Sequence, residues 1–176
     1  MLRLIALSLL IAAPVFAAAA DPPASHPAAA ENRMAPLAGL VGTWRGTGWV
    51  LLPNGTRSEF ESQEVVTSRI GGAALLVEGR HWQPGNPDEV VHDAIGLITW
   101  DARGGGHRFH TALANGQSGD FAMDVGEGRF SWRIDTPQGP MDYVSEFADG
   151  TWRERGRMTL PRGRTVDFFE MTLTRN

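Results

Sequence analysis

The sequence predicts an all-β fold, an antiparallel up-and-down β-barrel of about ten strands. Helical periodicity is absent after Val41, short β-rich runs recur at a spacing of roughly 8 to 14 residues, and turn-forming residues separate them. The ten runs are Val41–Leu52, Ser58–Ile70, Ala73–Trp82, Val90–Asp101, His107–Ala114, Asp120–Val125, Arg129–Asp135, Met141–Phe147, Thr151–Leu160 and Thr165–Arg175.

The turns between these runs set the register of the strands. Gly71-Gly72, Asn115-Gly116 and Asp149-Gly150 are typical hairpin turns. Residues paired across an antiparallel hairpin share one face, so the inward parity of one strand fixes that of the next. When the inward face is assigned strand by strand in this way, apolar side chains lie on one face of the sheet and charged side chains lie on the other. We therefore expect a closed barrel, because ten open strands would leave two long exposed edges.

Two strands carry large side chains of both parities. Trp44 and Trp49 lie on opposite faces of the first strand, and Phe168 adjoins Phe169 in the last. We expect a bulge or a buried patch on the outer wall in each of these strands.

The composition excludes several classes of function. All 16 basic residues are arginine and the chain has no cysteine, which removes Schiff-base and thiolate catalysis and disulfide bonds. A formal net charge of −4 without an arginine run argues against a nucleic-acid partner. No nucleophile elbow, P-loop, dinucleotide fingerprint or His-Glu-x-x-His helix occurs, so hydrolase, kinase and dehydrogenase activities have no support.

Residues 1–20 are typical of a secretory signal peptide. Arg3 supplies the positive charge, the apolar run that follows is too short to span a bilayer, and cleavage is expected after Ala17, Ala19 or Ala20. The sequence thus predicts a periplasmic or secreted protein with no integral membrane segment once the signal is removed.

Residues 21–33 are rich in proline and alanine and predict a flexible leader ahead of a single barrel domain, 34–176. A short helical turn from Met34 to Leu40 is expected to open this domain, with Leu37 and Leu40 facing the core.

Polar residues on the inward face are the candidate binding residues, since a barrel interior that only packed would be apolar. Centring a loop at 86–87 makes His81 and His92 direct cross-strand neighbours, and the Gly71-Gly72 register places Glu64 diagonally beside His81. Three successive strands thus bring a carboxylate and two imidazoles to one place.

Three interpretations of this trio stay open. Glu64 can fix one imidazole in a structural network, since buried polar groups usually find partners. The imidazoles can instead hydrogen-bond a bound molecule, or the trio can form a metal or acid–base centre.

A second wall brings Tyr143 and Ser145 close to Glu154, with Ser145 opposite Glu154. An inward carboxylate is costly unless it is hydrogen-bonded or hydrated, which favours a wet cavity over a dry core. The aromatic residues expected along the cavity walls are Trp100, Trp132, Trp152, Phe109, Phe121 and Phe130.

Two segments resemble a known superfamily. Leu40-Val41-Gly42-Thr43-Trp44 resembles the Gly-x-Trp start of calycins, which include lipocalins, fatty-acid-binding proteins and nitrobindin-like barrels. Thr172-Leu173-Thr174-Arg175 resembles the closing strand whose arginine packs on that tryptophan. With His92-Asp93-Ala94-Ile95-Gly96-Leu97 in mid-chain, the chain from Met34 resembles a calycin-like bacterial family, and the strand count favours the ten-stranded branch.

The resemblance implies an internal cavity for an apolar ligand, closed at one end by Trp44 and Arg175. It also implies heme binding as an alternative, because nitrobindin-like heme proteins bind iron through a histidine of a late strand. Here the last histidine is His110, well before the late strands. The chain departs from the pattern at that point.

The main hypothesis is therefore a secreted or periplasmic barrel that holds a small apolar molecule without a cofactor. Its ligand-binding residues would be Glu64, His81, His92, Tyr143, Glu154 and Trp132, with no metal ligands and no assigned catalytic residue. The alternatives are an isomerase, cyclase or hydratase that uses the inward Glu, His and Tyr side chains, and a heme-binding barrel.

Overall fold

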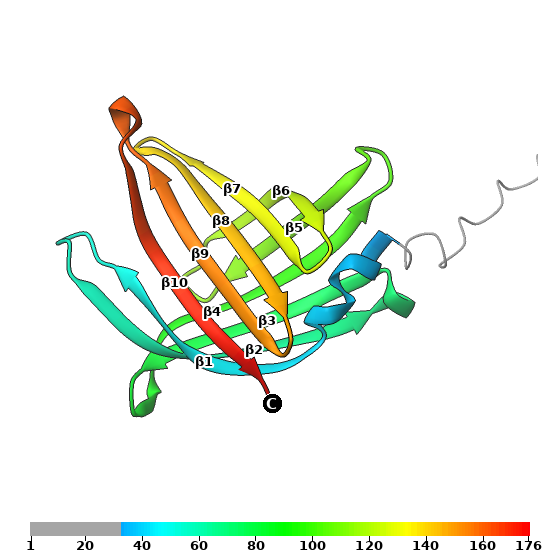
Figure 1. The fold of residues 1–176 in the computed structure, drawn as a ribbon, viewed down its shortest axis with the longest axis horizontal. Helices are drawn as coiled ribbons and strands as arrows, with labels where there is room; N and C mark the ends of the chain where they lie inside the picture. Colours follow the sequence, from blue (N-terminus) through cyan, green and yellow to red (C-terminus); the bar gives the residue numbers. More distant parts are fainter. Residues whose placement is uncertain (1–32) are drawn as a thin grey trace, which may run out of the picture.

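The computed structural model describes residues 33–176, which form one closed barrel of ten antiparallel strands (Figure 1). The predicted all-β, calycin-like fold is thus confirmed. The predicted signal peptide, and all of the predicted leader except Arg33, lie outside the described residues. The strands are β1 (Gly42–Leu51), β2 (Arg57–Arg69), β3 (Ala74–Gln83), β4 (Asn86–Asp101), β5 (Gly106–Leu113), β6 (Ser118–Gly126), β7 (Arg129–Thr136), β8 (Gly139–Ala148), β9 (Thr151–Thr159) and β10 (Thr165–Arg175).

Each strand pairs with its neighbour in sequence, and β10 returns to pair with β1, so the sheet has no free end strand. This is the up-and-down topology that the turn residues predict. Three short 3₁₀ segments complete the fold, namely η1 (Ala35–Leu40), η2 (Ile70–Gly72) and η3 (Pro161–Gly163).

One predicted turn is wrong. The β3–β4 hairpin turns immediately after Gln83, which pairs with Asn86, and not at 86–87. Irregularities on both sides of Trp82 then add residues to β4, so that His81 pairs with His92 after all. His81 and His92 are therefore neighbours as predicted, but because of the irregularities at Trp82 and not because of a turn at 86–87.

The two ends of the barrel differ. One end holds η1, which opens the domain as the predicted helical turn and lies across the strand ends at the right of Figure 1. Leu37 and Leu40 of η1 are fully buried. The other end carries the β1–β2, β3–β4, β5–β6, β7–β8 and β9–β10 turns. We call these the closed end and the mouth.

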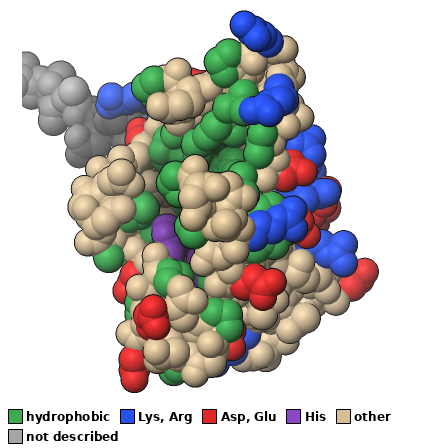
Figure 2. All heavy atoms as spheres, turned by 90° about the vertical axis from the view of Figure 1, so that its left-hand side faces the viewer, with side chains coloured by type: hydrophobic (Ala, Val, Ile, Leu, Met, Phe, Trp, Pro, Cys, Tyr) green, Lys and Arg blue, Asp and Glu red, His purple; other side chains and the backbone are tan. Residues whose placement is uncertain are grey.

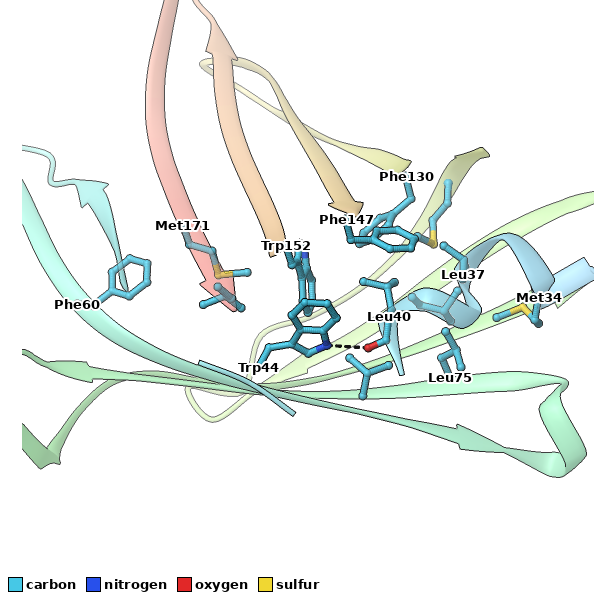
Figure 3. Close-up of a cluster of buried hydrophobic side chains, with 14 residues drawn as sticks. Met34, Leu37, Leu40, Trp44, Phe60, Leu75, Phe130, Phe147, Trp152 and Met171 are labelled. Atoms are coloured by element: carbon cyan, nitrogen blue, oxygen red, sulfur yellow. Dashed lines mark hydrogen bonds between the residues drawn. The ribbon is translucent and has the colours of Figure 1, made fainter. Parts of the chain in front are cut away.

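Trp44 is the central side chain of the closed end (Figure 3). Its indole Nε1 donates to the Leu40 carbonyl at 2.7 Å, and its ring meets Trp152 edge-on at 5.8 Å between centroids. Phe130, Phe147 and Leu75 belong to the same buried cluster. Burial of these large apolar side chains supplies the main driving force for folding here.

Arg175 completes the closure predicted for it. Its guanidinium lies 4.2 Å from the Trp44 ring centroid and donates to the carbonyls of Gly39 and Val41. Gly42 has a φ of +145°, and a Cβ atom there would collide with the Arg175 guanidinium. The Gly-x-Trp motif and the terminal arginine are therefore parts of one contact.

Of the two strands with large residues of both parities, β10 has the expected bulge, whereas β1 has no register shift and its Trp49 is only half-buried. In β10 the register shifts between Asp167 and Phe169, which lets both Phe168 and Phe169 contact interior side chains. In β1, Trp49 lies on the outer wall, where the Arg57 guanidinium covers it at 3.8 Å.

The outer wall carries ion pairs that join adjacent strands. Arg133 with Asp142, Arg155 with Glu146 and Arg157 with Asp167 are paired at 2.6 to 3.0 Å. Within the described part of the chain, no helix has the length and apolar character needed to cross a membrane.

Replacing Arg175 by Ala should lower the free energy of unfolding by roughly 1–3 kcal/mol, since the cation–π contact and two hydrogen bonds are lost together. Urea denaturation of R175A against R153A, an exposed arginine of β9, measures the effect. Equal loss of stability in both variants would contradict this role for Arg175.

Candidate ligand-binding site

Several inward-facing side chains near the mouth are only half-buried, although Phe60 and His81 are buried there. Met141, Tyr143, Met158 and Val166 all face inward at this end and keep partial exposure. Figure 2 views the barrel from the mouth, where hydrophobic side chains gather and a histidine is visible beside them. The half of the barrel toward the mouth is therefore accessible from outside.

Aromatic rings form a nearly continuous band around this accessible half. Centroids of neighbouring rings in the band lie 4.4 to 6.2 Å apart. We call this band the aromatic collar, and its rings, in order round the barrel, are His92, His81, Phe60, Phe169, Tyr143, Trp132 and Phe109.

Glycines allow the collar to cross β1 and β9, which contribute no ring. A Cβ atom on Gly48 of β1 would collide with the Phe60 ring, and one on Gly156 of β9 would lie 2.6 Å from Phe168. The absent side chains let rings from strands that do not pair directly come into contact. β6 adds no ring to the band either.

His81 is the most constrained member of the collar. Its ring stacks on Phe60 with centroids 4.4 Å apart and an interplanar angle of 5°, and its Nε2 lies 3.2 Å from Glu64 Oε1. Burial lowers the pKa of His81 to about 4 and raises that of Glu64 to about 8. The pair is therefore neutral near pH 6 to 7, a hydrogen bond rather than an ion pair.

Space for the Glu64 carboxyl comes from the glycine beside it. Gly79 pairs with Glu64, and a Cβ atom there would lie 2.7 Å from both carboxyl oxygens. Any larger residue at 79 would displace the carboxyl from His81.

His92 lies at the rim of the mouth. It is exposed, its ring centroid is 5.0 Å from that of His81, and it has no hydrogen-bond partner among residues 33–176. Partial desolvation, then the neighbouring His81, lower the pKa of His92. His92 thus offers an uncommitted, neutral imidazole to a molecule in the mouth.

A second polar cluster lies on β8 and β9, and β1 and β10 separate β9 from the Glu64 strand β2. The Trp152 indole donates to Ser145 Oγ at 3.3 Å, and Ser145 donates to Glu154 Oε2 at 2.6 Å. Burial and, less strongly, the Glu64 carboxyl raise the pKa of Glu154 to about 8, against the lowering effect of the Ser145 hydrogen bond. Burial and Glu154 also raise the pKa of Tyr143, which keeps its phenol neutral.

The two polar clusters belong to one layer beneath the collar. Ser62 of β2 contacts the Met171 sulfur of β10 at 4.0 Å across β1, where Gly46 and Gly48 leave the interior free. Ser62, Ser145, Met171 and Glu154 each lie two residues nearer the closed end than a ring of the collar or than Gly156, and Glu64 lies two residues beyond Ser62. We call it the polar floor, and its members are Ser62, Glu64, Ser145, Glu154 and Met171.

The six candidate binding residues therefore occupy two adjacent layers. His81, His92, Tyr143 and Trp132 belong to the collar, while Glu64 and Glu154 belong to the polar floor. The predicted cross-strand pairs His81 with His92 and Ser145 with Glu154 are both observed, and Trp132 pairs with Tyr143.

Sequence reasoning missed Phe60 and Phe169 as members of the collar. Phe60 has inward parity on its strand and could have been found from the register alone. Phe169 was hidden by the β10 bulge, which inverts parity between Asp167 and Phe169.

The trio of Glu64, His81 and His92 does not form a metal site. Glu64 contacts His81 alone, and no group of three His, Asp or Glu side chains within residues 33–176 is placed to hold a metal ion. The interpretations that remain for the trio are a structural network, a ligand clamp and an acid–base centre.

Residues 33–141, from η1 to the start of β8, match the family model described as THAP4-like, heme-binding beta-barrel domain. The chain belongs to this family. The match to the THAP4-like family ends before β9 and β10, so it does not cover the late strands in which nitrobindin-like heme proteins are expected to carry their histidine.

Two solved structures share the barrel. Rv2717c from M. tuberculosis superposes with a TM-score of 0.61 at 14% identity, over 81% of this chain and 96% of that one. The S-type phycobiliprotein lyase CPES from Guillardia theta gives a TM-score of 0.50 at 12% identity, over 78% and 89% of the two chains. Both likenesses concern the fold alone. No curated protein matches the sequence.

The buried carboxyls should make the barrel less stable as pH rises from 6.5 to 8. Unfolded Glu64 and Glu154 lose their protons near pH 4.5, whereas the folded groups hold them to about pH 8, so the folded state binds more protons throughout this window. His81 acts with the opposite sign, but only between about pH 4 and 6.5.

Chemical denaturation at pH 6.5, 7.25 and 8 tests this expectation. The free energy of unfolding should fall by up to about 1.4 kcal/mol per pH unit for each carboxyl. E64Q and E154Q should each flatten the slope, since a glutamine cannot ionise. A wild-type protein whose stability is constant or rises over this window would contradict the assignment.

Proposed function

We propose that the barrel binds a heme-type tetrapyrrole in its mouth. The aromatic collar is the observation that carries this proposal, since it lines the half of the barrel toward the mouth with flat rings, of which Phe60 and His81 are buried and the other five are at least partly exposed. Stacking and apolar burial against such rings stabilise a planar aromatic ligand. Membership of the THAP4-like, heme-binding family supports the same ligand class.

The donor set of the collar fits heme iron. A neutral imidazole is a usual axial ligand of heme, and His92 presents one at the rim of the mouth. His81 is less suited, because its Nε2 lies against Glu64 and its ring is stacked on Phe60. Phe169 and Met171, the inward residues of β10 beneath the mouth, include no imidazole, so the expected late-strand ligand is replaced in this chain.

Heme bound in the mouth would supply a redox-active iron able to coordinate small molecules. Different residues of the chain would then hold different parts of the heme. His92 would bind the metal, and His81, fixed by Glu64, would support the His92 ring through their contact. The collar would exclude water from the macrocycle, and the neutral polar floor would place no charge beneath it.

In its broader form, the same proposal is that the barrel binds a small apolar molecule. The mouth would accept other flat hydrophobic molecules, and the family match favours heme among them. Acid–base catalysis by the inward carboxyls and Tyr143 remains a prediction from the sequence. Both carboxyls are protonated at neutral pH, which would suit them as proton donors rather than as bases.

Reconstitution of the full chain with hemin tests the proposal. We expect a Soret band with one heme per chain, and a loss of affinity on the order of tenfold or more in H92A, with a shifted band from altered ligation. H110A is the matched control, because His110 lies on the outer wall beside Asp120.

Two results would contradict the proposal. Absence of a Soret band from the wild-type protein would exclude heme. Equal affinities and spectra in H92A, H110A and the wild type would exclude His92 as the iron ligand.

We also propose that the protein is exported, on the basis of the signal-like residues 1–20. Expression of the full chain in a Gram-negative host should yield periplasmic protein whose N-terminus is Ala18, Ala20 or Asp21. Recovery of cytoplasmic protein that begins at Met1 or Leu2 would contradict export.

A further inference from the structure

The outer wall of β1–β3 carries a row of two arginines with no carboxylate between them. Arg45 of β1 pairs with Gln63 of β2, and Gln63 pairs in turn with Arg80 of β3. Four arginines elsewhere on the outer wall contact a carboxylate of the neighbouring strand at 2.6 to 3.0 Å. This row differs, because a neutral amide lies between the two guanidiniums.

The β3–β4 turn, at the lower left of Figure 1, closes one side of the row. The Trp82 indole Nε1 donates to Glu61 Oε2 at 2.9 Å, and the backbone N–H of Gly85 donates to Glu61 Oε1 at 3.0 Å. These two bonds hold the turn against the outer face of β2. A cleft of about 180 Å³ results, lined by Arg45, Gln63, Arg80, Trp82 and Pro87.

Both guanidiniums of the cleft lack a counter-charge. Neither Arg45 nor Arg80 forms an ion pair within residues 33–176. Arg80 is in register with Asp93 of β4, but its Nη2 donates to the Pro87 carbonyl at 3.4 Å. Glu61, the carboxylate beside the cleft, already accepts hydrogen bonds through both oxygens. The two like charges therefore favour an anion from outside the chain.

The donors of the cleft suit a phosphate group. The forked N–H donors of arginine match phosphate oxygens, and two guanidiniums balance the charge of a dianion. The Gln63 amide adds further N–H donors between them.

The Trp82 indole and the Pro87 ring add an apolar wall beside these donors. Pockets for drug-sized ligands typically have volumes of roughly 300–1,000 Å³, so a cleft below that range holds only a small molecule. The occupant is therefore small, doubly charged at one end and apolar at the other.

We propose that this cleft is a second binding site, which takes a small organic phosphate monoester. Arg45 and Arg80 hold the phosphate across Gln63, and the organic group packs against Trp82. The site lies on the outer face of β1–β3, whereas the aromatic collar lies on the inner face of the barrel. Occupation of the cleft therefore does not require heme.

NMR titration of the ¹⁵N-labelled full chain with phenyl phosphate, in the absence of heme, tests this site. At about pH 7.5 phenyl phosphate carries nearly two charges, because its second pKa is about 6. The indole N–H signal of Trp82, assigned from its loss in W82F, reports a ligand in the cleft. Inorganic phosphate, which lacks the ring, and benzoate, which has a ring and a single charge, are the comparison ligands.

Two variants change the cleft in different ways. R45Q/R80Q removes both cations, and its matched control is R153Q/R164Q, which removes two exposed arginines outside the cleft. Q63E keeps both arginines but places a carboxylate between them, where it takes the position of the anion.

The wild type should bind phenyl phosphate severalfold more tightly than it binds inorganic phosphate or benzoate. R45Q/R80Q and Q63E should each lose affinity on the order of tenfold or more, since charge-assisted hydrogen bonds to the phosphate are lost or blocked. R153Q/R164Q should bind as the wild type does. Added salt should weaken binding, because the exposed charges are screened.

Four results would overturn the inference. A Trp82 signal that does not shift in the wild type would exclude the site. Equal losses in R153Q/R164Q and R45Q/R80Q would show that binding follows net charge and not the cleft. Unchanged affinity in Q63E would exclude a phosphate between the two arginines. Equal affinities for benzoate and phenyl phosphate would overturn the assignment to phosphate. None of these results bears on heme, which the Soret band tests separately.

Discussion

The structure depends on the way Trp44 fills one end of the barrel. The indole is held by the nearby Leu40 carbonyl, by Trp152 and by the Arg175 guanidinium, so that the end of η1 and two strands far along the chain meet on one side chain. A ten-stranded barrel is wide enough to leave interior space unless large side chains occupy it. Because η1 and Trp44 fill only the closed end, the half toward the mouth stays accessible.

The interior is consequently layered from the closed end outward as apolar core, polar floor and aromatic collar. The polar floor is tolerated in the interior because its carboxyls are neutral and hydrogen-bonded, to His81 on one wall and Ser145 on the other. Gly79 leaves room for the Glu64 carboxyl, while Gly48 and Gly156 leave room for the Phe60 and Phe168 rings. The same layering separates a ligand in the collar from the packed core.

Much of this arrangement could be predicted from parity, because each hairpin transmits the inward face of one strand to the next. Ser145 opposite Glu154 and Glu64 beside His81 follow from it directly. The alternation of residues could not predict where the regular pairing of the strands is interrupted. The β10 bulge brought Phe169 into the collar, and the displaced β3–β4 turn was compensated by bulges at Trp82. The incomplete pairing of β6 with β7 could not be predicted from the alternation of residues either.

A crystal structure of the hemin-reconstituted full chain tests the central claim most directly, that the collar is a tetrapyrrole site. The account predicts electron density for the macrocycle within the mouth, against Trp132 and Tyr143, with His92 as the protein ligand to iron. Density for heme on the outer wall, or iron bound by any other residue, would contradict it.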